Sequence, residues 1–271
     1  MRVGILGAGK MGEMIIQGLK RSDPKRIYQI QATTRSPQSA KEIADRLSIR
    51  CHNDNLKLVE TSDVIILCCK PQQVETILKS IQPVLSSSGS NNKKLLISIC
   101  AAIPTQNLSL WSGEKTAVVR AMPNTPCLIG EGMTVLTSGP RSTSRSLKTA
   151  EAIFATLGKT VVIEEALMDG ATGLSGCGPA YVYLIIEALS EAGVKVGLSR
   201  QTSTLLAAQT LAGAAQMVLQ RGEHPAALKD EVTTPAGCTI DGLMALEDGK
   251  VRVALIKAVL AASQRSKALA S

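Results

Sequence analysis

Three glycines near the start of the chain have the spacing of a phosphate-binding turn. The GxGxxG motif comprises Gly7, Ala8, Gly9, Lys10, Met11 and Gly12. Gly7 permits a tight turn, and Gly9 lets a pyrophosphate approach the backbone closely. Gly12 lets the helix pack against the strand. The motif follows an aliphatic run and opens a predicted helix over 13–20. Because N–H groups at a helix start attract anions, the motif predicts a dinucleotide site.

The second predicted strand ends without the carboxylate that usually binds the ribose 2′-hydroxyl of NAD. It runs instead into Thr34, Arg35 and Ser36. The Arg35 guanidinium can pair with a 2′-phosphate, and the two hydroxyls beside it can donate hydrogen bonds. The pattern therefore favours NADPH, with NADH as the second choice. The alternative is that Arg35 only ends a strand in water.

Three more segments follow predicted strands, where ligands of open α/β sheets bind. They are Cys69-Lys70-Pro71, Cys100-Ala101-Ala102 and Met122-Pro123-Asn124-Thr125-Pro126. Small residues at these points would let a nicotinamide ribose lie against the backbone. Lys70 could equally be an ordinary surface lysine, and the proline-flanked Asn124 could belong to a structural turn.

Two segments rich in Gly, Ser and Thr are predicted loops that each lead into a helix. The first spans 173–179 and contains Ser175, and the second spans 233–239 and contains Thr234, Gly237, Cys238 and Thr239. N–H groups and hydroxyls at a helix start suit a small carboxylate. Two such loops favour an anion pocket, with helix capping alone as the alternative.

A parallel sheet would bring the N-terminal segments together. Aliphatic runs predict strands at 2–6, 27–33, 64–69, 95–99, 116–120 and 133–136, and the pattern changes after about 161–163. Helix-like stretches lie between several of them, and this alternation predicts an α/β domain with a mostly parallel sheet covered by helices. A run of Ser, Gly and Asn at 86–92 predicts a surface loop.

The second part of the chain reads as Ala- and Leu-rich helices, so we predict domains at 1–163 and 164–271. Ser199 is the predicted N-cap of a long helix that ends near Gly222, Pro225 opens a short helix, and Gly249 separates two more. The long helix carries few charges. It is therefore either a subunit interface or a helix buried within the chain.

Composition argues against several classes of protein. The chain has 271 residues, of which 45% are hydrophobic, with 1 Trp, 3 Tyr and 1 Phe. So few aromatics speak against base-stacking platforms, and the +8 net charge comes from scattered Lys and Arg, so no nucleic-acid partner is expected. No apolar run is long enough to span a membrane. Because the first predicted strand begins directly after Met1 and leaves no room for a leader peptide, none is expected.

The cysteines indicate a reducing compartment. There are 7 Cys with no CxxC pair and 2 His, which argues against both a zinc site and a disulfide framework. Several of the thiols lie in apolar runs and are predicted to be small core residues. We therefore expect a cytoplasmic protein without a bound metal.

Taken together, these motifs resemble those of the pyrroline-5-carboxylate reductase family. The resemblance rests on SGxGPAY at 175–181, on Met122–Pro126 and on the segment 224–239, and it extends from Arg2 to about Leu269. It implies NAD(P)H-dependent reduction of 1-pyrroline-5-carboxylate to L-proline, the last step of proline biosynthesis. It also implies a Rossmann-like, doubly wound N-terminal domain and an all-α dimerisation domain, with a homodimer that frequently forms a ring of five dimers.

The resemblance also implies site residues. The cofactor would contact Gly7–Gly12, Asn55, Lys70, Ala101 and Met122–Asn124. The loop 234–239 would hold the substrate carboxylate, with Thr239 near the imine. The chain departs from the family pattern at Cys177, which replaces Ser, and at Ala236, which replaces the first Gly of PGG.

The proposed substrate loops contain no strong proton donor. Neither 173–179 nor 233–239 includes His, Lys, Asp or Glu. A carbonyl reductase needs such a group to protonate the developing alkoxide. A cyclic imine that binds already protonated needs only a hydride, so we expect catalysis by positioning, with the Thr239 hydroxyl orienting the nitrogen.

Two other functions compete with this interpretation. A reductase of the β-hydroxyacid dehydrogenase type would place a Lys on the helix that follows 173–179, but 181–191 contains none. A nucleotide-binding protein without catalytic activity would not need the intact loop 233–239. The absence of Lys from 181–191 and the intact loop 233–239 both favour the imine reductase.

Overall fold

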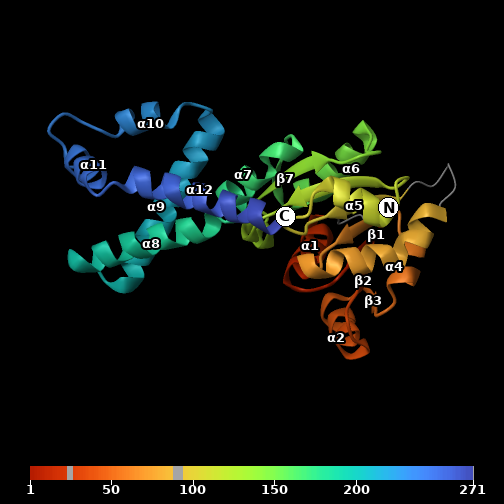
Figure 1. Cartoon of the computed structure of the whole chain (residues 1–271). Coiled ribbons are helices and arrows are strands. Elements are labelled where there is room, and N and C mark those ends of the chain that lie inside the picture. Colours follow the sequence, from red (N-terminus) through yellow and green to blue (C-terminus); the bar gives the residue numbers. More distant parts are fainter. Residues whose placement is uncertain (23–26, 88–93, 271) are drawn as a thin grey trace. The chain divides into compact units, whose positions relative to one another are not determined.

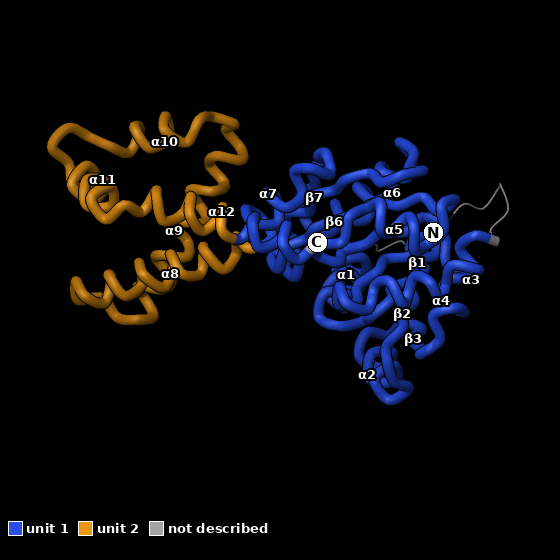
Figure 2. The backbone as a smooth tube through the Cα atoms, viewed as in Figure 1, with its two compact units in different colours: residues 1–176, 262–271 blue, residues 177–261 orange. Residues whose placement is uncertain are grey.

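The computed structural model describes residues 1–22, 27–87 and 94–270. The chain divides into two compact units, which Figure 2 colours separately. Unit 1 comprises residues 1–176 and 262–271, and unit 2 comprises residues 177–261. The domain boundary between residues 163 and 164 stays a prediction.

Unit 1 is built on a sheet of eight strands among the described residues (Figure 1). The strands are β1 (Arg2–Leu6), β2 (Gln29–Thr33), β3 (Arg50–His52), β4 (Val64–Leu67), β5 (Leu95–Ser98), β6 (Ala117–Met122), β7 (Gly132–Ser138) and β8 (Gly158–Val162). Their order is β3-β2-β1-β4-β5-β6-β7-β8, and every neighbouring pair is parallel except β6 and β7. The predicted α/β class is confirmed.

The sequence predicts neither β8, which ends in the run at 161–163 where the pattern changes, nor β3. Strand β3 has only three residues, Arg50, Cys51 and His52, and no aliphatic run. It forms because an edge position beside β2 satisfies its backbone hydrogen bonds, with Cys51 opposite Ala32.

Helices cover both faces of the sheet. They are α1 (Lys10–Ser22), α2 (Pro37–Leu47), α3 (Asn55–Thr61), α4 (Val74–Ser87), α5 (Thr105–Ser112), α6 (Ser144–Phe154) and α7 (Met168–Ala171). Alternate strand residues enter different cores: Ile66 packs with α1, α2 and α6, whereas Ile65 packs with α3, α4 and α5. The continuous apolar run of β4 is thus explained, because both of its faces are buried.

Single-turn elements connect several of these helices and strands. They are 3₁₀ turns at Pro71–Gln73, Thr125–Ile129, Ala155–Leu157 and Glu165–Leu167, and a π-helical turn at Thr172–Gly176. Of the surface loop predicted at 86–92, residues 88–92 lie outside the described residues, and residues 86 and 87 end α4.

Unit 2 consists of helices, as predicted. They are α8 (Gly178–Lys195), α9 (Arg200–Arg221), α10 (Pro225–Glu231), α11 (Cys238–Asp248) and the first part of α12 (Val251–Ala270). The Ser199 hydroxyl accepts a hydrogen bond from the Thr202 N–H at 3.1 Å, which confirms the predicted N-cap of α9. Gly222 ends α9 in the left-handed conformation, with φ 66°.

The prediction of a loop at 173–179 is wrong. Residues 172–176 form the π-helical turn, and α8 begins at Gly178. The hydroxyls of this stretch satisfy helical carbonyls: Thr172 Oγ1 donates to the Met168 carbonyl at 2.8 Å, and Ser175 Oγ donates to the Ala171 carbonyl at 3.2 Å. The two hydroxyls are thus bonded within the helical stretch that continues from α7, and neither caps α8.

The long helix α9 leaves large apolar side chains uncovered within the single chain. Leu205 is 66% exposed and Leu206 is 52% exposed. The alternative that α9 is an ordinary buried helix therefore fails, and the pattern agrees with a subunit interface. Among the described residues, no helix is both long and apolar enough to cross a membrane.

Candidate functional site

The turn after β1 is held by the ends of two neighbouring strands. The N–H groups of Gly7 and Ala8 both donate to the Thr33 carbonyl of β2, at 3.2 and 2.8 Å. Gly7 has φ 96°, and a Cβ there would lie 3.1 Å from the Cys68 carbonyl oxygen. Only glycine meets both conditions, so the first glycine of the motif is required by the fold.

The other two glycines of the motif differ in what surrounds them. A Cβ at Gly12 would lie 2.5 Å from the Gly7 carbonyl oxygen, so Gly12 lets α1 pack on the turn. A Cβ at Gly9 would meet no described atom within 4 Å. Packing within the chain therefore does not require glycine at position 9. The open space lies beside the first turn of α1, whose N–H groups have no intrahelical partners, where the motif predicts the pyrophosphate.

The segment after β2 presents one exposed cation. Ser36 is the N-cap of α2 and accepts from the Ser39 N–H at 3.2 Å, and the Thr34 hydroxyl donates to the Ser36 carbonyl at 3.1 Å. Both hydroxyls are thus used to form the turn. Arg35 between them is exposed at the carboxyl end of the strand.

The remaining strand-end segments lie at the same edge of the sheet, because β1 to β6 run parallel. Asn55 is the half-buried first residue of α3, just after β3. Lys70 is exposed and leads from β4 into the 3₁₀ turn that starts at Pro71. Ala102 follows β5 and is buried, with an unusual φ of 60°.

Asn124 joins two predicted site segments within unit 1. Its Nδ2 donates to the Ser175 carbonyl at 3.1 Å, and its Oδ1 accepts from the Met133 N–H at 2.9 Å. The Asn124 side-chain amide therefore links β7 to the π-helical turn, and we call this link the Asn124 strut. It supports the interpretation that the proline-flanked segment 122–126 is a structural turn. The same strut holds Ser175 beside the end of β6.

The segment 233–239 belongs to unit 2 and forms a tight turn before α11. The Gly237 N–H donates to the Thr234 carbonyl at 3.0 Å, and a Cβ at Gly237 would lie 2.4 Å from Thr234 Oγ1. Ala236 has φ 55°. Cys238 and Thr239 form the exposed first turn of α11, where N–H groups lack intrahelical partners.

An ion pair within unit 1 escaped the sequence analysis. Arg120 on β6 is only 4% exposed, and its Nη1 lies 2.7 Å from Glu165 Oε1. The same carboxylate oxygen accepts from the Thr105 N–H at 3.4 Å, at the start of α5. Among the described residues, Arg120 Nη2 and Glu165 Oε2 are buried without a hydrogen-bond partner. Arg120 is a charged residue inside the apolar run 117–122, and a buried charge needs a partner. This position could therefore have indicated the ion pair from the sequence.

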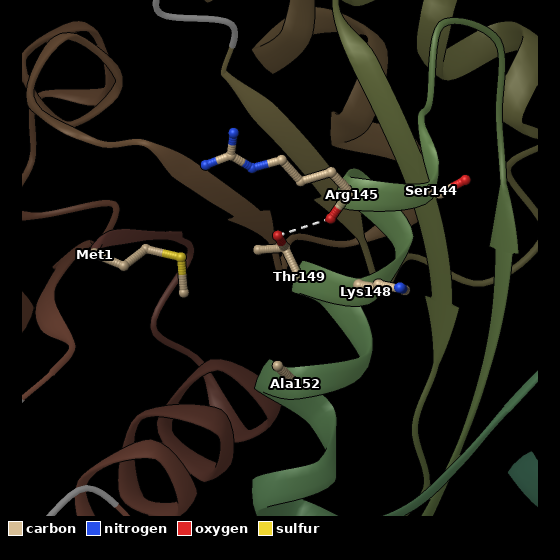
Figure 3. Close-up of a pocket in the computed structure, with 6 residues that line it drawn as sticks. All are labelled: Met1, Ser144, Arg145, Lys148, Thr149 and Ala152. Atoms are coloured by element: carbon tan, nitrogen blue, oxygen red, sulfur yellow. Dashed lines mark hydrogen bonds between the residues drawn. The ribbon is translucent and has the colours of Figure 1, made fainter.

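A cavity of about 390 Å³ lies elsewhere in unit 1, beside α6 (Figure 3). Its lining includes Met1, Arg145 and Lys148. Met1 precedes β1, so this cavity is at the amino ends of the parallel strands. It contains none of the predicted site residues and is separate from the candidate site.

Comparison with known proteins decides the family. Residues 165–269 match the family model described as pyrroline-5-carboxylate reductase dimerisation, and residues 2–102 match NADP oxidoreductase coenzyme F420-dependent. The pyrroline-5-carboxylate reductase of Methanosarcina acetivorans is 40% identical over 99% of this chain and 97% of its own length. The chain belongs to the pyrroline-5-carboxylate reductase family.

Other relatives agree over the full length. The pyrroline-5-carboxylate reductase of Arabidopsis thaliana is 38% identical over 99% of this chain and 95% of its own length. A crystal structure of Plasmodium falciparum pyrroline carboxylate reductase with NADP bound is 36% identical, covers 100% of this chain and 98% of its own, and superposes with a TM-score of 0.87. The pyrroline-5-carboxylate reductase of Coxiella burnetii gives a TM-score of 0.91 at 32% identity, over 99% of this chain and 98% of its own. The predicted family and the Rossmann-like fold with a helical dimerisation domain are confirmed.

Proposed function

We propose that this chain reduces 1-pyrroline-5-carboxylate to L-proline and takes its hydride from NADPH. The observation that carries the proposal is the open space at Gly9 beside the start of α1, in a chain of this family. The relatives named as pyrroline-5-carboxylate reductases, one of them with NADP bound, support the same reaction.

We assign the cofactor to the carboxyl edge of the parallel strands. Its phosphates would lie at the turn of the glycine motif, and Arg35 would pair with the 2′-phosphate. When bound, NADPH supplies the hydride. The full set is Gly7, Ala8, Gly9, Lys10, Met11, Gly12, Thr34, Arg35, Ser36, Asn55, Cys69, Lys70, Pro71, Ala101, Ala102, Met122, Pro123 and Asn124.

We assign two segments to the substrate, each within its own unit: Ser175 in unit 1, and the turn before α11 in unit 2. Backbone N–H groups at Cys238 and Thr239, with the Thr234 hydroxyl, would bind the carboxylate, and Gly237 keeps the turn tight. The Thr239 hydroxyl would orient the imine nitrogen. The segments 172–179 and 233–239 hold no ionisable group other than the Cys177 and Cys238 thiols. These segments would therefore promote the reaction by positioning the substrate and not by supplying a strong acid.

Substitution of Thr239 tests the mechanism. The oxidation of NADPH is followed by absorbance with 1-pyrroline-5-carboxylate as substrate. Thr239→Ala should lower kcat about 10- to 100-fold, the effect of losing one hydrogen bond to a charged group, while Thr239→Ser keeps most of the activity. If the wild type does not oxidise NADPH with the imine, the proposed function is wrong. Full activity of Thr239→Ala would contradict only the role of this hydroxyl.

We also propose a homodimer that assembles into a ring of five dimers. The match of residues 165–269 to the dimerisation model and the exposed leucines of α9 support an assembly of this kind. Sedimentation equilibrium should give ten times the chain mass of 28.5 kDa, and twice that mass would support the dimer but contradict the ring. A cytoplasmic location is part of the same proposal, supported by the seven cysteines, all of which are free thiols.

A further inference from the structure

Two cysteine thiols face each other at the carboxyl edge of the sheet. Cys69 follows β4 and Cys100 follows β5, and these strands are parallel neighbours with Leu67 opposite Ser98. Two residues further along, the same register places Cys69 opposite Cys100. Their Sγ atoms are 4.0 Å apart, and Cys100 Sγ also donates to the Cys69 carbonyl at 3.2 Å.

Side-chain alternation selects this pair over its neighbour in the sequence. Cys69 and Cys100 pack with the core on the α3, α4 and α5 face, whereas Cys68 packs with the core on the opposite face. Adjacent strands lie about 4.8 Å apart, within the range of Cα separations that disulfides span. The Cys69–Cys100 pair can thus form a disulfide with a small local movement, and Cys68 cannot do so from its face.

The surroundings of the two thiols favour reaction between them. The Cys69 thiol is half-buried and the Cys100 thiol is buried. The hydrogen bond from the Cys69 thiol lowers the pKa of Cys100, and the same bond with burial raises the pKa of Cys69. When Cys100 loses its proton, the Cys69 S–H can donate to the Cys100 thiolate, which then lies beside a second sulfur that can react with it.

We propose that Cys69 and Cys100 form a reversible disulfide on exposure to a hydroperoxide, and that the disulfide lowers NADPH affinity. The effect on affinity rests on the proposed function, because the next residues, Lys70 and Ala101, are assigned to the cofactor. Disulfide formation shortens the Sγ–Sγ distance from 4.0 Å to about 2.05 Å. The disulfide also removes the hydrogen bond from Cys100 Sγ to the Cys69 carbonyl, and so changes the contacts that hold the ends of β4 and β5 beside Ala102, whose φ of 60° is already unfavourable.

The chemistry balances with one hydroperoxide as oxidant. One thiolate attacks a peroxide oxygen, the O–O bond breaks, and the sulfur becomes a sulfenic acid as hydroxide or alkoxide leaves. The second thiolate attacks that sulfur, the S–S bond forms, and the S–O bond breaks with loss of hydroxide. Two thiols and one hydrogen peroxide give one disulfide and two waters, so both sulfurs are oxidised and the peroxide is reduced. Dithiothreitol reverses the step.

Peptide mapping tests the bond directly. The full-length protein is treated with hydrogen peroxide, alkylated and digested with trypsin. Because Lys70 precedes Pro71, the cysteines should appear in peptides 58–79 and 95–115. The proposal expects these two peptides to be joined and to separate on reduction, in the wild type and in Cys68→Ala. Absence of the joined pair, or its loss in Cys68→Ala with retention in Cys69→Ala, would overturn the assignment.

Nucleotide affinity tests the consequence. We expect the Kd for NADPH, measured by fluorescence, to rise about tenfold or more on oxidation of the wild type and to recover with dithiothreitol. Cys51→Ala, with its thiol on the edge strand β3, should respond in the same way as wild type. In Cys69→Ala the Kd should not change on oxidation, and Cys100→Ala repeats the test if it folds.

The two proposals fail in different ways. An unchanged Kd after complete disulfide formation would overturn the control of affinity. If the reduced wild type fails to bind NADPH, the nucleotide site itself is wrong, and the peptide map still decides whether the disulfide forms.

Discussion

Ala236 occupies a backbone conformation that favours glycine. Its φ is 55°, in the turn that leads into α11, and it stands where the family pattern has the first glycine of PGG. A Cβ in this left-handed region costs about 1–2 kcal/mol. The alanine thus keeps the turn of the substrate segment at the expense of stability.

Replacing Ala236 by glycine should therefore stabilise the protein. We expect Ala236→Gly to raise the free energy of unfolding by about 0.5–1 kcal/mol, since relief of strain exceeds the added entropy of the unfolded chain. Ala152, exposed within α6, is the matched control, and Ala152→Gly should lower stability by about 1 kcal/mol. Urea unfolding measures both. A loss of stability in Ala236→Gly would contradict the account of strain.

Arg35 is the residue on which the choice between NADPH and NADH should depend. We expect Arg35→Ala to lower kcat/KM for NADPH about 10- to 100-fold, because a charge-assisted hydrogen bond contributes about 1.5–3 kcal/mol. The value for NADH should stay within about twofold, since NADH has no 2′-phosphate. Lys41, exposed on α2, is the control for a general loss of positive charge. Equal losses of kcat/KM with NADPH and NADH would show that Arg35 does not bind the 2′-phosphate.

The β1–turn–α1 element separates a folding role from a binding role. The turn is tied to β2 through Thr33 and lies against the end of β4 at Cys68, so its backbone is held by the chain itself. Gly12 is enclosed by that backbone, whereas Gly9 faces open space. The same motif therefore contains one glycine required by packing and another that leaves room for a ligand.

Alanine substitutions at these two glycines should have different effects. Gly9→Ala should unfold close to wild type but bind NADPH at least about tenfold more weakly, because its methyl group occupies the open space. Gly12→Ala should lower stability by about 1–3 kcal/mol through overpacking against the Gly7 carbonyl. Thermal unfolding and NADPH fluorescence separate the two effects. Normal NADPH binding by Gly9→Ala would place the pyrophosphate elsewhere.

Several large apolar side chains are exposed in the single chain, and a second subunit could cover some of them in the assembled protein. Leu205 on α9 and Leu110 on α5 have similar exposures in the single chain, 66% and 63%. Only Leu205 lies within residues 165–269, which match the dimerisation model. Exposure alone therefore does not distinguish the two leucines, whereas membership of the dimerisation segment does.

A charge at each position tests the interface. We expect Leu205→Glu to give a monomer or to weaken the dimer at least about 100-fold, because an interface must bury the new carboxylate without a partner. Leu110→Glu should keep the wild-type mass. Sedimentation velocity across a range of concentrations measures both variants. An unchanged assembly in Leu205→Glu would exclude this face of α9 from the interface.

Much of the fold follows from patterns that act over short distances along the chain. The aliphatic runs predict β1, β2 and β4 to β7, and the glycine motif predicts the turn after β1. Ser199 and Gly222 correctly mark the ends of α9, because capping bonds join residues only three or four positions apart. The resemblance to the reductase family likewise rests on short segments of local sequence.

Other features depend on contacts between residues far apart in the chain. β3 forms because β2 offers an edge at which its backbone hydrogen bonds are satisfied. The Asn124 strut to Ser175 spans 51 residues, and the Cys69–Cys100 contact spans 31. No periodicity or spacing specifies such partners, because they are set by strand order and register, which the chain acquires only when it folds.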